Sequence, residues 1–226
     1  MIPKIIHYCW FGRNPKPYAV LRYIQTWKDK LPDYEIKEWN EDNFDYKKLR
    51  YTREAYKAKK FAFVSDVARL FALYYYGGIY LDTDIIVCKS LNDYLYNNTF
   101  FGYEVNNLVG TGIIGAEKNS KWIKDFLMSY NHCSFITLRG GFNVCPNTIR
   151  LKNILKDLGC KFDNKEVILP YDIHIYPYEY FCAKDYRTGK IECTTNTVTI
   201  HDYTKTWKPS KKLSLKNRIY NLLLKL

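Results

Sequence analysis

LYYYGGIYLDTDIIV, residues 73–87, is the stretch that decides the fold. Gly77 and Gly78 are typical of the C-terminal end of a helix, where glycine readily takes the backbone conformation that stops it. The apolar run after them is of strand length, and two acids, Asp82 and Asp84, interrupt it. We therefore expect a helix to end at Gly77 and a buried strand to begin directly after it, as in an α/β domain.

The helix before the two glycines has a clear apolar periodicity. Its apolar side chains are spaced i, i+3, i+4 and i+7, which places them on one face turned to a core: Val67, Leu70, Phe71 and Tyr74. Ser65 precedes this stripe, and its hydroxyl is suited to capping the first turn. The pattern predicts a helix capped by Ser65.

The rest of the chain repeats the alternation of strands and helices. Residues 2–11, 18–29 and 34–39 have the patterns of a strand, a helix and a second strand. Further strands are expected at 99–104, 112–116, 167–169 and 197–201, and further helices at 120–130 and 146–158. The sequence therefore predicts one α/β domain over residues 1–207 with a mostly parallel central sheet.

Composition favours a single packed core and a polyanionic partner. Of the 226 residues, 47% are apolar and 17% aromatic, which excludes a disordered chain. Lys and Arg number 35 against 23 Asp and Glu, for a formal charge of +12. Nucleic acid, an anionic bilayer and phosphorylated small molecules all suit that charge, so composition alone leaves the partner open.

The seven cysteines are scattered, odd in number and without a C-x-x-C spacing. This pattern argues against a zinc site and a disulfide framework, and it favours free thiols in a reducing compartment. The sequence has neither the long apolar N-terminal stretch of a signal peptide nor the uninterrupted apolar length of a membrane-spanning helix. We therefore expect a cytoplasmic protein.

Asp82 and Asp84 are the strongest candidates for the site of chemistry. Two acids one residue apart on a strand point to the same face, and an apolar strand would not bury two negative charges without compensation. Magnesium or manganese supplies that compensation and keeps coordination positions open for diphosphate oxygens. The alternative is a turn or strand-end pair that binds only water and lysine.

A family resemblance rests on these same residues. Ser65-Asp66-x-x-Arg69, followed by Leu73-Tyr74-x-x-Gly77-Gly78-Ile79-Tyr80-Leu81-Asp82-Thr83-Asp84, resembles the signature of the DXD-containing glycosyltransferases of family 32. That family includes fungal initiating mannosyltransferases and many capsule and polysaccharide enzymes, and it is related to the glucosylating domains of clostridial toxins. The opening Ile2-Pro-Lys-Ile-Ile-His-Tyr-Cys-Trp10 and the tail His201-Asp-Tyr-Thr-Lys-Thr206-Trp207 also resemble family elements.

The resemblance implies a GT-A type fold, a Rossmann-like α/β/α sandwich, and an activity. That activity is metal-dependent transfer of a hexose, with retention at the anomeric carbon, from a nucleotide-diphosphate sugar to a glycan acceptor. UDP-galactose, UDP-glucose and UDP-N-acetylhexosamine are the candidate donors, and bacterial capsular or surface polysaccharide is the candidate product. No nucleic-acid partner is implied.

Several residue roles follow from the resemblance. Asp82 is expected to contact the ribose or the donor sugar, Asp84 to bind Mn²⁺ or Mg²⁺, and Arg69 to counter charge on the donor. Residues expected along the donor are Ser65, Asp66 and Tyr80. The alternative for Asp66 and Arg69, which are three apart on a helix, is a surface ion pair that contributes little.

Trp10 ends the first predicted strand, where open α/β sheets bind ligands. The resemblance suggests that its ring stacks on the donor base. The alternative is an aromatic side chain that closes the core.

The C-terminal part of the domain has two candidate metal ligands. His201 is expected to complete the metal shell, because imidazole is a normal manganese ligand; the adjacent Asp202 is the alternative. Thr206 stands where relatives often have serine and is a candidate donor contact. Trp207 would lie over the donor as part of a mobile lid that excludes water.

Residues 208–226 form a basic tail. Their apolar residues fall on one predicted helical stripe and their polar and basic residues on another, which predicts an amphipathic helix. Such a helix suits an anionic bilayer and would place the active site beside a lipid-linked acceptor. The alternative is a helix that docks on its own domain or on a dimer partner.

Two other classes of protein share some of these features. A phosphatase of the haloacid-dehalogenase type uses an Asp-x-Asp pair, but the sequence has no convincing downstream acidic pair for magnesium. A nucleic-acid-binding module would explain the basic residues of 47–60 and 205–225, but no recognisable binding fold accompanies them.

Overall fold

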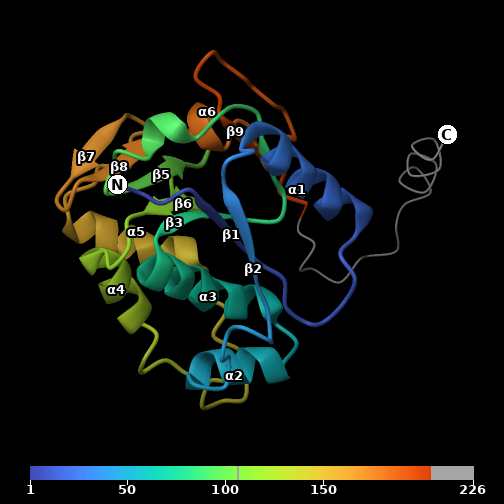
Figure 1. The fold of residues 1–226 in the computed structure, drawn as a ribbon. Coiled ribbons are helices and arrows are strands. Elements are labelled where there is room, and N and C mark those ends of the chain that lie inside the picture. Colours follow the sequence, from blue (N-terminus) through green and yellow to red (C-terminus); the bar gives the residue numbers. More distant parts are fainter. Residues whose placement is uncertain (106, 205–226) are drawn as a thin grey trace.

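The computed structural model describes residues 1–105 and 107–204 (Figure 1). The elements are β1 (Ile5–Cys9), α1 (Tyr18–Lys30), β2 (Glu35–Trp39), α2 (Arg50–Lys57), α3 (Phe61–Tyr76), β3 (Gly78–Leu81), β4 (Ile85–Val87), η1 (Asn92–Tyr94), β5 (Thr99–Tyr103), β6 (Val109–Ala116), α4 (Lys121–Met128), α5 (Asn147–Asp157), β7 (Val167–Leu169), β8 (Ile173–Tyr176), α6 (Tyr178–Phe181) and β9 (Thr199–His201). Thr206, Trp207 and the basic tail 208–226 lie outside the described residues.

The main sheet has the strand order β2-β1-β3-β6-β5-β8-β7. The prediction of an α/β fold is confirmed, but the prediction of a mostly parallel sheet is wrong because the sheet is mixed. β1 pairs in parallel with β2 and β3, and β5 with β8. The pairs β3–β6, β5–β6 and β7–β8 are antiparallel. Short connections at residues 104–108 and 170–172 explain this difference, since a parallel pair needs a long crossover.

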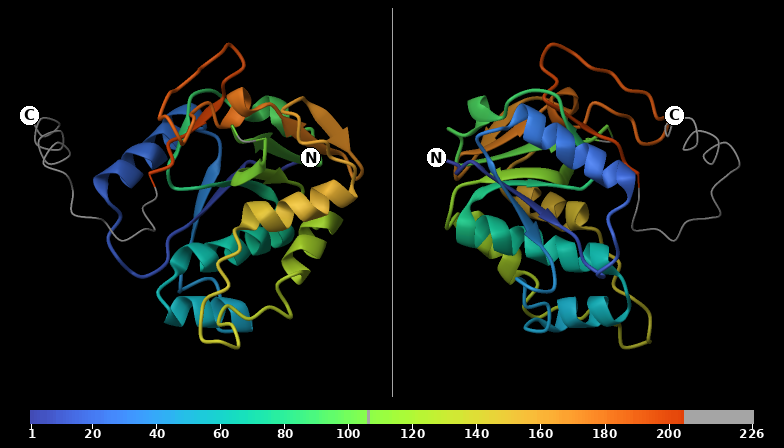
Figure 2. Two further views of the ribbon diagram at one scale, coloured as in Figure 1. Left: turned by 180° about the vertical axis from the view of Figure 1, so that it is seen from behind. Right: turned by 45° about the vertical axis from the view of Figure 1, so that its right-hand side comes forward.

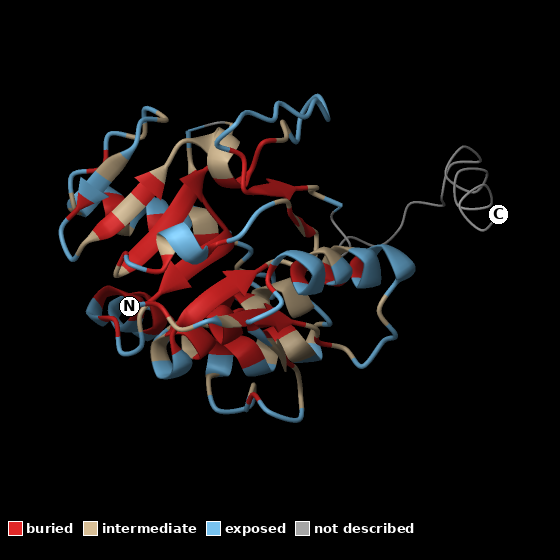
Figure 3. Ribbon diagram, turned by 45° about the horizontal axis from the view of Figure 1, so that its top comes forward, coloured by how far each residue is buried: buried red, intermediate tan, exposed pale blue. Residues whose placement is uncertain are grey.

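Helices cover both faces of this sheet (Figures 1 and 2). One face buries a cluster that includes Val20, Ile24 and Trp27 of α1. The other face buries a second cluster, to which α2, α3, α4 and α5 contribute. Figure 3 shows the strands buried between the helical layers, whose outer surfaces are exposed. The predicted sandwich of α, β and α layers is therefore present.

Helix α3 ends where the sequence predicts and begins earlier. Gly77 has φ +66° and donates its N–H to the Leu73 carbonyl at 2.9 Å, as expected for a C-cap. A Cβ on Gly77 would lie 2.7 Å from the Lys118 nitrogen, so only glycine fits there. The prediction that Ser65 caps the helix is wrong, because α3 starts at Phe61 and the Ser65 hydroxyl donates to the Phe61 carbonyl at 3.2 Å.

The two acids also lie in a different element from the one predicted. Asp82-Thr83-Asp84 forms a turn between β3 and β4, rather than part of one continuous strand. β4 leaves the main sheet and pairs antiparallel with β9, with Ile85 opposite His201. The argument from alternating side chains on a strand therefore fails, although the acids still converge.

All seven cysteines are free thiols in the structure. None of the helices in residues 1–105 and 107–204 combines the length and the apolar composition needed to cross a membrane.

Candidate active site

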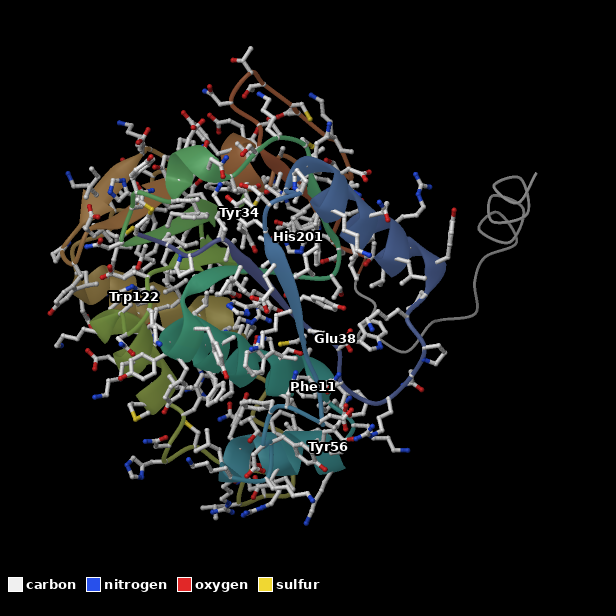
Figure 4. All side chains as sticks on the ribbon, viewed as in Figure 1. Phe11, Tyr34, Glu38, Tyr56, Trp122 and His201 are labelled. Atoms are coloured by element: carbon white, nitrogen blue, oxygen red, sulfur yellow. The ribbon has the colours of Figure 1, made fainter. Side chains whose placement is uncertain are left out.

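A cleft of about 900 Å³ opens at the carboxyl ends of β1 and β3. Ligands commonly bind at this edge of an α/β sheet. The residues singled out from the sequence that line it are Trp10, Ser65, Asp66, Arg69, Tyr80, Asp82, Asp84 and His201. Figure 4 labels His201 and Phe11, two residues of the cleft wall.

Asp82, Asp84 and His201 form a group that could hold a metal ion. One ligand atom from each lies within 4.8 Å of the others. The turn after β3 supplies the two carboxylates, and the β4–β9 pairing brings His201 beside them. Two carboxylate oxygens and one imidazole nitrogen are a donor set that suits manganese or magnesium.

Asp84 makes contacts through both oxygens of its carboxylate. Its Oδ1 lies 3.2 Å from His201 Nε2, and its Oδ2 accepts a hydrogen bond from the Thr204 N–H at 2.8 Å. Burial acts to raise the pKa of Asp84, but the contacts with His201 and Thr204 outweigh it and lower the pKa. The carboxyl group is therefore ionised at neutral pH.

His201 is buried and carries the complementary charge. Burial acts to lower its pKa, but hydrogen bonds to Asp84 and Cys182 outweigh burial and raise the pKa well above the ordinary value. The ring also stacks on Tyr203, with 3.9 Å between centroids. A metal ion that binds the ring would therefore compete with its proton.

Asp202 lies apart from this group. Its carboxylate accepts hydrogen bonds from the Tyr23 hydroxyl and the Lys184 ammonium. Of the two ligands that the sequence left open, the geometry therefore favours His201.

Arg69 connects the α3 residues to the acidic turn. Its guanidinium lies 3.0 Å from Asp66, 3.4 Å from Asp82 and 4.5 Å from the Tyr80 ring centroid. Arg69 is only 5% exposed and Asp66 only 9%, so the alternative of a surface ion pair is wrong. Burial, only partly offset by Arg69, raises the pKa of Asp66 to about 6.

The two oxygens of Asp82 have different surroundings. Oδ1 accepts the Tyr80 hydroxyl at 2.8 Å and faces Arg69. A Cβ on Gly112 would lie 3.2 Å from Oδ2 and 2.9 Å from the His201 ring, so the absence of a side chain there leaves room for both groups. Gly112 of β6 therefore makes room for the group of Asp82, Asp84 and His201.

Trp10 lies in the cleft wall directly after β1 and is half-buried. Its ring N–H donates to the Asn14 carbonyl at 2.7 Å, and the side chain packs partly against the core. The alternative of an aromatic side chain that closes the core describes part of this position, and stacking on the donor base stays a prediction.

Sequence reasoning missed two polar residues of the cleft, Glu104 and Asn147. Burial raises the pKa of Glu104, which follows β5 and has an electrostatic interaction with His201 and Asp82. Asn147 accepts the Tyr130 hydroxyl at 2.7 Å and donates to the Asp66 carbonyl at 3.3 Å. The one available signal for Glu104 was an acid at the end of the apolar run TFFGY; Asn147 had none.

Comparison with known proteins shows what the region of this site is similar to. The family described as "Glycosyltransferase sugar-binding region containing DXD motif" matches residues 17–101. The chain is 30% identical over 167 residues to the uncharacterized glycosyltransferase L373 of Acanthamoeba polyphaga mimivirus, covering 66% of this chain and 65% of that protein. It is 34% identical over 130 residues to inositol phosphoceramide mannosyltransferase 3 of Schizosaccharomyces pombe, covering 54% of this chain and 35% of that protein. The chain thus spans less than two thirds of the length of these relatives.

Solved structures give weaker similarity. The PaToxG glycosyltransferase aligns with a TM-score of 0.49 and 20% identity, over 71% of this chain and 73% of that chain. The galactosyltransferase LgtC aligns with a TM-score of 0.47 and 14% identity, over 98% of this chain and 96% of that chain. The family match includes α3 with Arg69 and the Asp82-Thr83-Asp84 turn, the parts that build the cleft. The residues that build the cleft are thus similar to the family of glycosyltransferase sugar-binding regions that contain a DXD motif.

Proposed function

We propose that the protein is a metal-dependent glycosyltransferase of GT-A type that transfers a hexose from a nucleotide-diphosphate sugar to a glycan acceptor. The observation that carries this proposal is the group Asp82, Asp84 and His201 at the carboxyl edge of the sheet, with Arg69 beside it. A diphosphate needs several positive charges around it, and a divalent ion together with a buried guanidinium provides them.

The donor set divides the roles among these residues. Asp84 and His201 would hold Mn²⁺ or Mg²⁺, which would supply a Lewis acid for the departing nucleotide diphosphate. Asp82, fixed on one oxygen by Tyr80 and Arg69, contacts the ribose or the sugar with the other. Ser65 and Asp66 line the same wall, and Trp10 stacks on the base.

Transfer proceeds with retention by attack on the face that the diphosphate leaves. The bond from the anomeric carbon to the diphosphate oxygen breaks, the bond to the acceptor oxygen forms, and the acceptor proton passes to the leaving diphosphate. Arg69 is buried and fixed, so its charge needs little reorganisation as negative charge develops. Thr206 as a donor contact and Trp207 as a lid that excludes water remain predictions, since both residues lie outside the described part of the chain.

The finer assignment concerns the substrates and the place of action. UDP-galactose, UDP-glucose or UDP-N-acetylhexosamine is the donor, and a lipid-linked glycan of bacterial capsular or surface polysaccharide is the acceptor. The protein acts in the cytoplasm, on the inner face of the membrane, for which the basic residues of the segment 208–226 provide a suitable charge.

A donor panel tests the proposal. Slow hydrolysis of UDP- and GDP-sugars is measured with and without Mn²⁺ for the wild type, Asp84→Asn and the control Asp93→Asn, whose side chain is exposed on η1. We expect one donor to be hydrolysed only with Mn²⁺, by the wild type and Asp93→Asn but not by Asp84→Asn. Metal-independent hydrolysis, or equal rates for the two variants, would contradict the proposal.

A further inference from the structure

The segment between α4 and α5 contains a small hairpin that projects an apolar tip. Ile136 and Phe142 form an antiparallel bridge, and the Thr137 N–H donates to the Gly141 carbonyl at 2.8 Å. Leu138 stands at the turn with a relative exposure of 108%, and Phe142 is 45% exposed. Two large apolar side chains thus face solvent on a turn whose backbone is hydrogen-bonded.

Helix α2 holds this hairpin in place through Glu54. Its carboxylate accepts hydrogen bonds from the Ser134 hydroxyl at 2.8 Å, the Phe135 N–H at 2.9 Å and the Ile136 N–H at 2.8 Å, and it pairs with Arg50 at 2.7 Å. Burial acts to raise the pKa of Glu54, but these bonds lower it to about 2. The anchor is therefore ionised at neutral pH.

Aromatic packing fixes the root of the hairpin as well. Phe135 is fully buried, stacks on Phe142 with 5.3 Å between centroids, and meets Tyr51 of α2 edge-on. The exposed tip is therefore presented in a set position beside α2. Figures 1 and 2 show this segment and α2 at the same end of the molecule in every view.

Cations lie on and beside α2, the helix that holds the hairpin. Lys47, Arg53, Lys57 and Lys59 line a cavity of about 640 Å³ beside α2. Lys60 Nζ lies 5.9 Å from the centroid of the Phe142 ring, so the cationic and apolar surfaces are continuous.

The nearby acids are occupied by other groups. Glu54 binds Arg50 and the hairpin, and Glu41 accepts the Gly12 N–H and the Tyr56 hydroxyl. Within residues 1–105 and 107–204, no carboxylate pairs with Lys47, Lys57 or Lys59, whose side chains are exposed. Asp45 accepts the backbone N–H of Lys47 at 3.1 Å, and no described carboxylate forms an ion pair with these three lysines.

We propose that the hairpin tip and the basic surface of α2 dock the protein on an anionic bilayer. Leu138 and Phe142 enter the headgroup region while the lysines on and beside α2 contact anionic lipid headgroups, the combination that binds peripheral proteins to membranes. This surface consists of residues of α2, its flanking loops and the hairpin alone.

The docking surface adjoins the cleft. Val144, Pro146 and Phe61 line the cleft, and Phe61 also lines the cavity beside α2. In Figure 4, Phe11 of the cleft lies between His201 and Tyr56 of α2. Docking here would turn the cleft toward the bilayer, where a lipid-linked acceptor lies; this consequence, unlike the docking itself, rests on the proposed function.

Vesicle sedimentation of the full chain tests the docking. The variants are Leu138→Ser and a control, Ile168→Ser on β7, whose side chain is 61% exposed. With vesicles of phosphatidylcholine and phosphatidylglycerol, we expect Leu138→Ser to weaken binding about tenfold and the control to match the wild type. Lys57→Gln should weaken it about fivefold, and its control Lys124→Gln on α4 should not.

A second readout reports insertion directly. Brominated lipids quench a tryptophan only when it enters the bilayer, so added quenching is expected for Leu138→Trp and not for Ile168→Trp. Equal binding by Leu138→Ser and Ile168→Ser, or no added quenching for Leu138→Trp, would overturn the docking. A loss confined to Lys57→Gln would also overturn it and indicate a site for soluble anions instead.

Failure of the proposed function gives a different result. Donor hydrolysis needs no vesicles, so Leu138→Ser should hydrolyse the donor as fast as the wild type. If no donor is hydrolysed while vesicle binding still depends on Leu138, the docking stands and the transferase proposal fails.

Discussion

The acidic turn in the cleft and the basic surface of α2 differ in how their charged side chains are held. At the turn, Asp82, Asp84 and His201 are held close together and bound by Arg69, Tyr80 and Thr204. On and beside α2, exposed lysines lie near an apolar tip with no carboxylate partner among the described residues. Fixed, buried charges recognise a small ligand of definite geometry, whereas exposed, mobile charges suit a broad surface. The overall net charge of +12 therefore describes neither region.

The largest effect on stability is expected from Arg69→Gln. This change leaves Asp66 and Asp82 without their buried cation, and the free energy of unfolding should fall by about 3–5 kcal/mol. The matched control is Arg50→Gln, which removes an exposed partner of Glu54 and should cost about 1 kcal/mol or less. Denaturant unfolding of both variants measures the difference. Equal losses of unfolding free energy would mean that the buried Arg69 contributes no more to stability than the exposed Arg50.

His201→Gln should have the next largest effect, on metal affinity. Removing one ligand should weaken Mn²⁺ binding at least about tenfold at neutral pH, whereas Asp202→Asn should change it little. The pKa of His201 is raised in the metal-free protein, so Mn²⁺ must displace a proton. Below that pKa, the affinity of the wild type for Mn²⁺ should therefore rise about tenfold for each unit by which the pH increases. In His201→Gln the affinity should depend less on pH. Calorimetric titrations at several pH values measure both quantities; a stronger effect of Asp202→Asn would assign the ligand to Asp202.

A smaller effect on stability is expected from Glu54→Gln, which removes the charge that anchors the hairpin of the docking surface. The amide keeps part of the hydrogen bonding to the hairpin, so unfolding free energy should fall by about 1–2 kcal/mol. The folded pKa of about 2 lies below the ordinary 4.5. The stabilisation is therefore present above pH 4.5, is lost as pH falls toward 2, and should be missing in the variant. Identical acid-unfolding curves would show that Glu54 does not anchor the hairpin.

The local pattern of the sequence predicted much of this architecture. The apolar stripe of α3 and the glycine at its end are properties of neighbouring residues, and both are present. The start of α3 was missed because Phe61 and Phe63 pack on Tyr56 and Phe135, contacts that no local pattern contains. Here tertiary packing overrides the capping preference of Ser65.

The sequence identified several residues of the candidate site, but it did not predict how they are arranged. Two acids in an apolar run indicated a charged ligand, but their turn exists because β4 pairs with the distant β9. Long-range pairing of strands also makes the sheet mixed and brings Gly112 beside the acids. The positions of Glu104 and Asn147 in the cleft likewise depend on contacts between distant parts of the chain. A single sequence carries little signal for such contacts.

Electron paramagnetic resonance of Mn²⁺ in the presence of UDP tests the central claim most directly. The wild type and Asp93→Asn should bind one Mn²⁺ per chain, with a free-ion signal that falls on titration. Asp84→Asn should leave the ion free under the same conditions, since it removes a ligand that ion pairing and backbone hydrogen bonds hold in place. Equal Mn²⁺ binding by Asp84→Asn and the wild type would contradict the assignment of the Asp82, Asp84 and His201 group as the metal site.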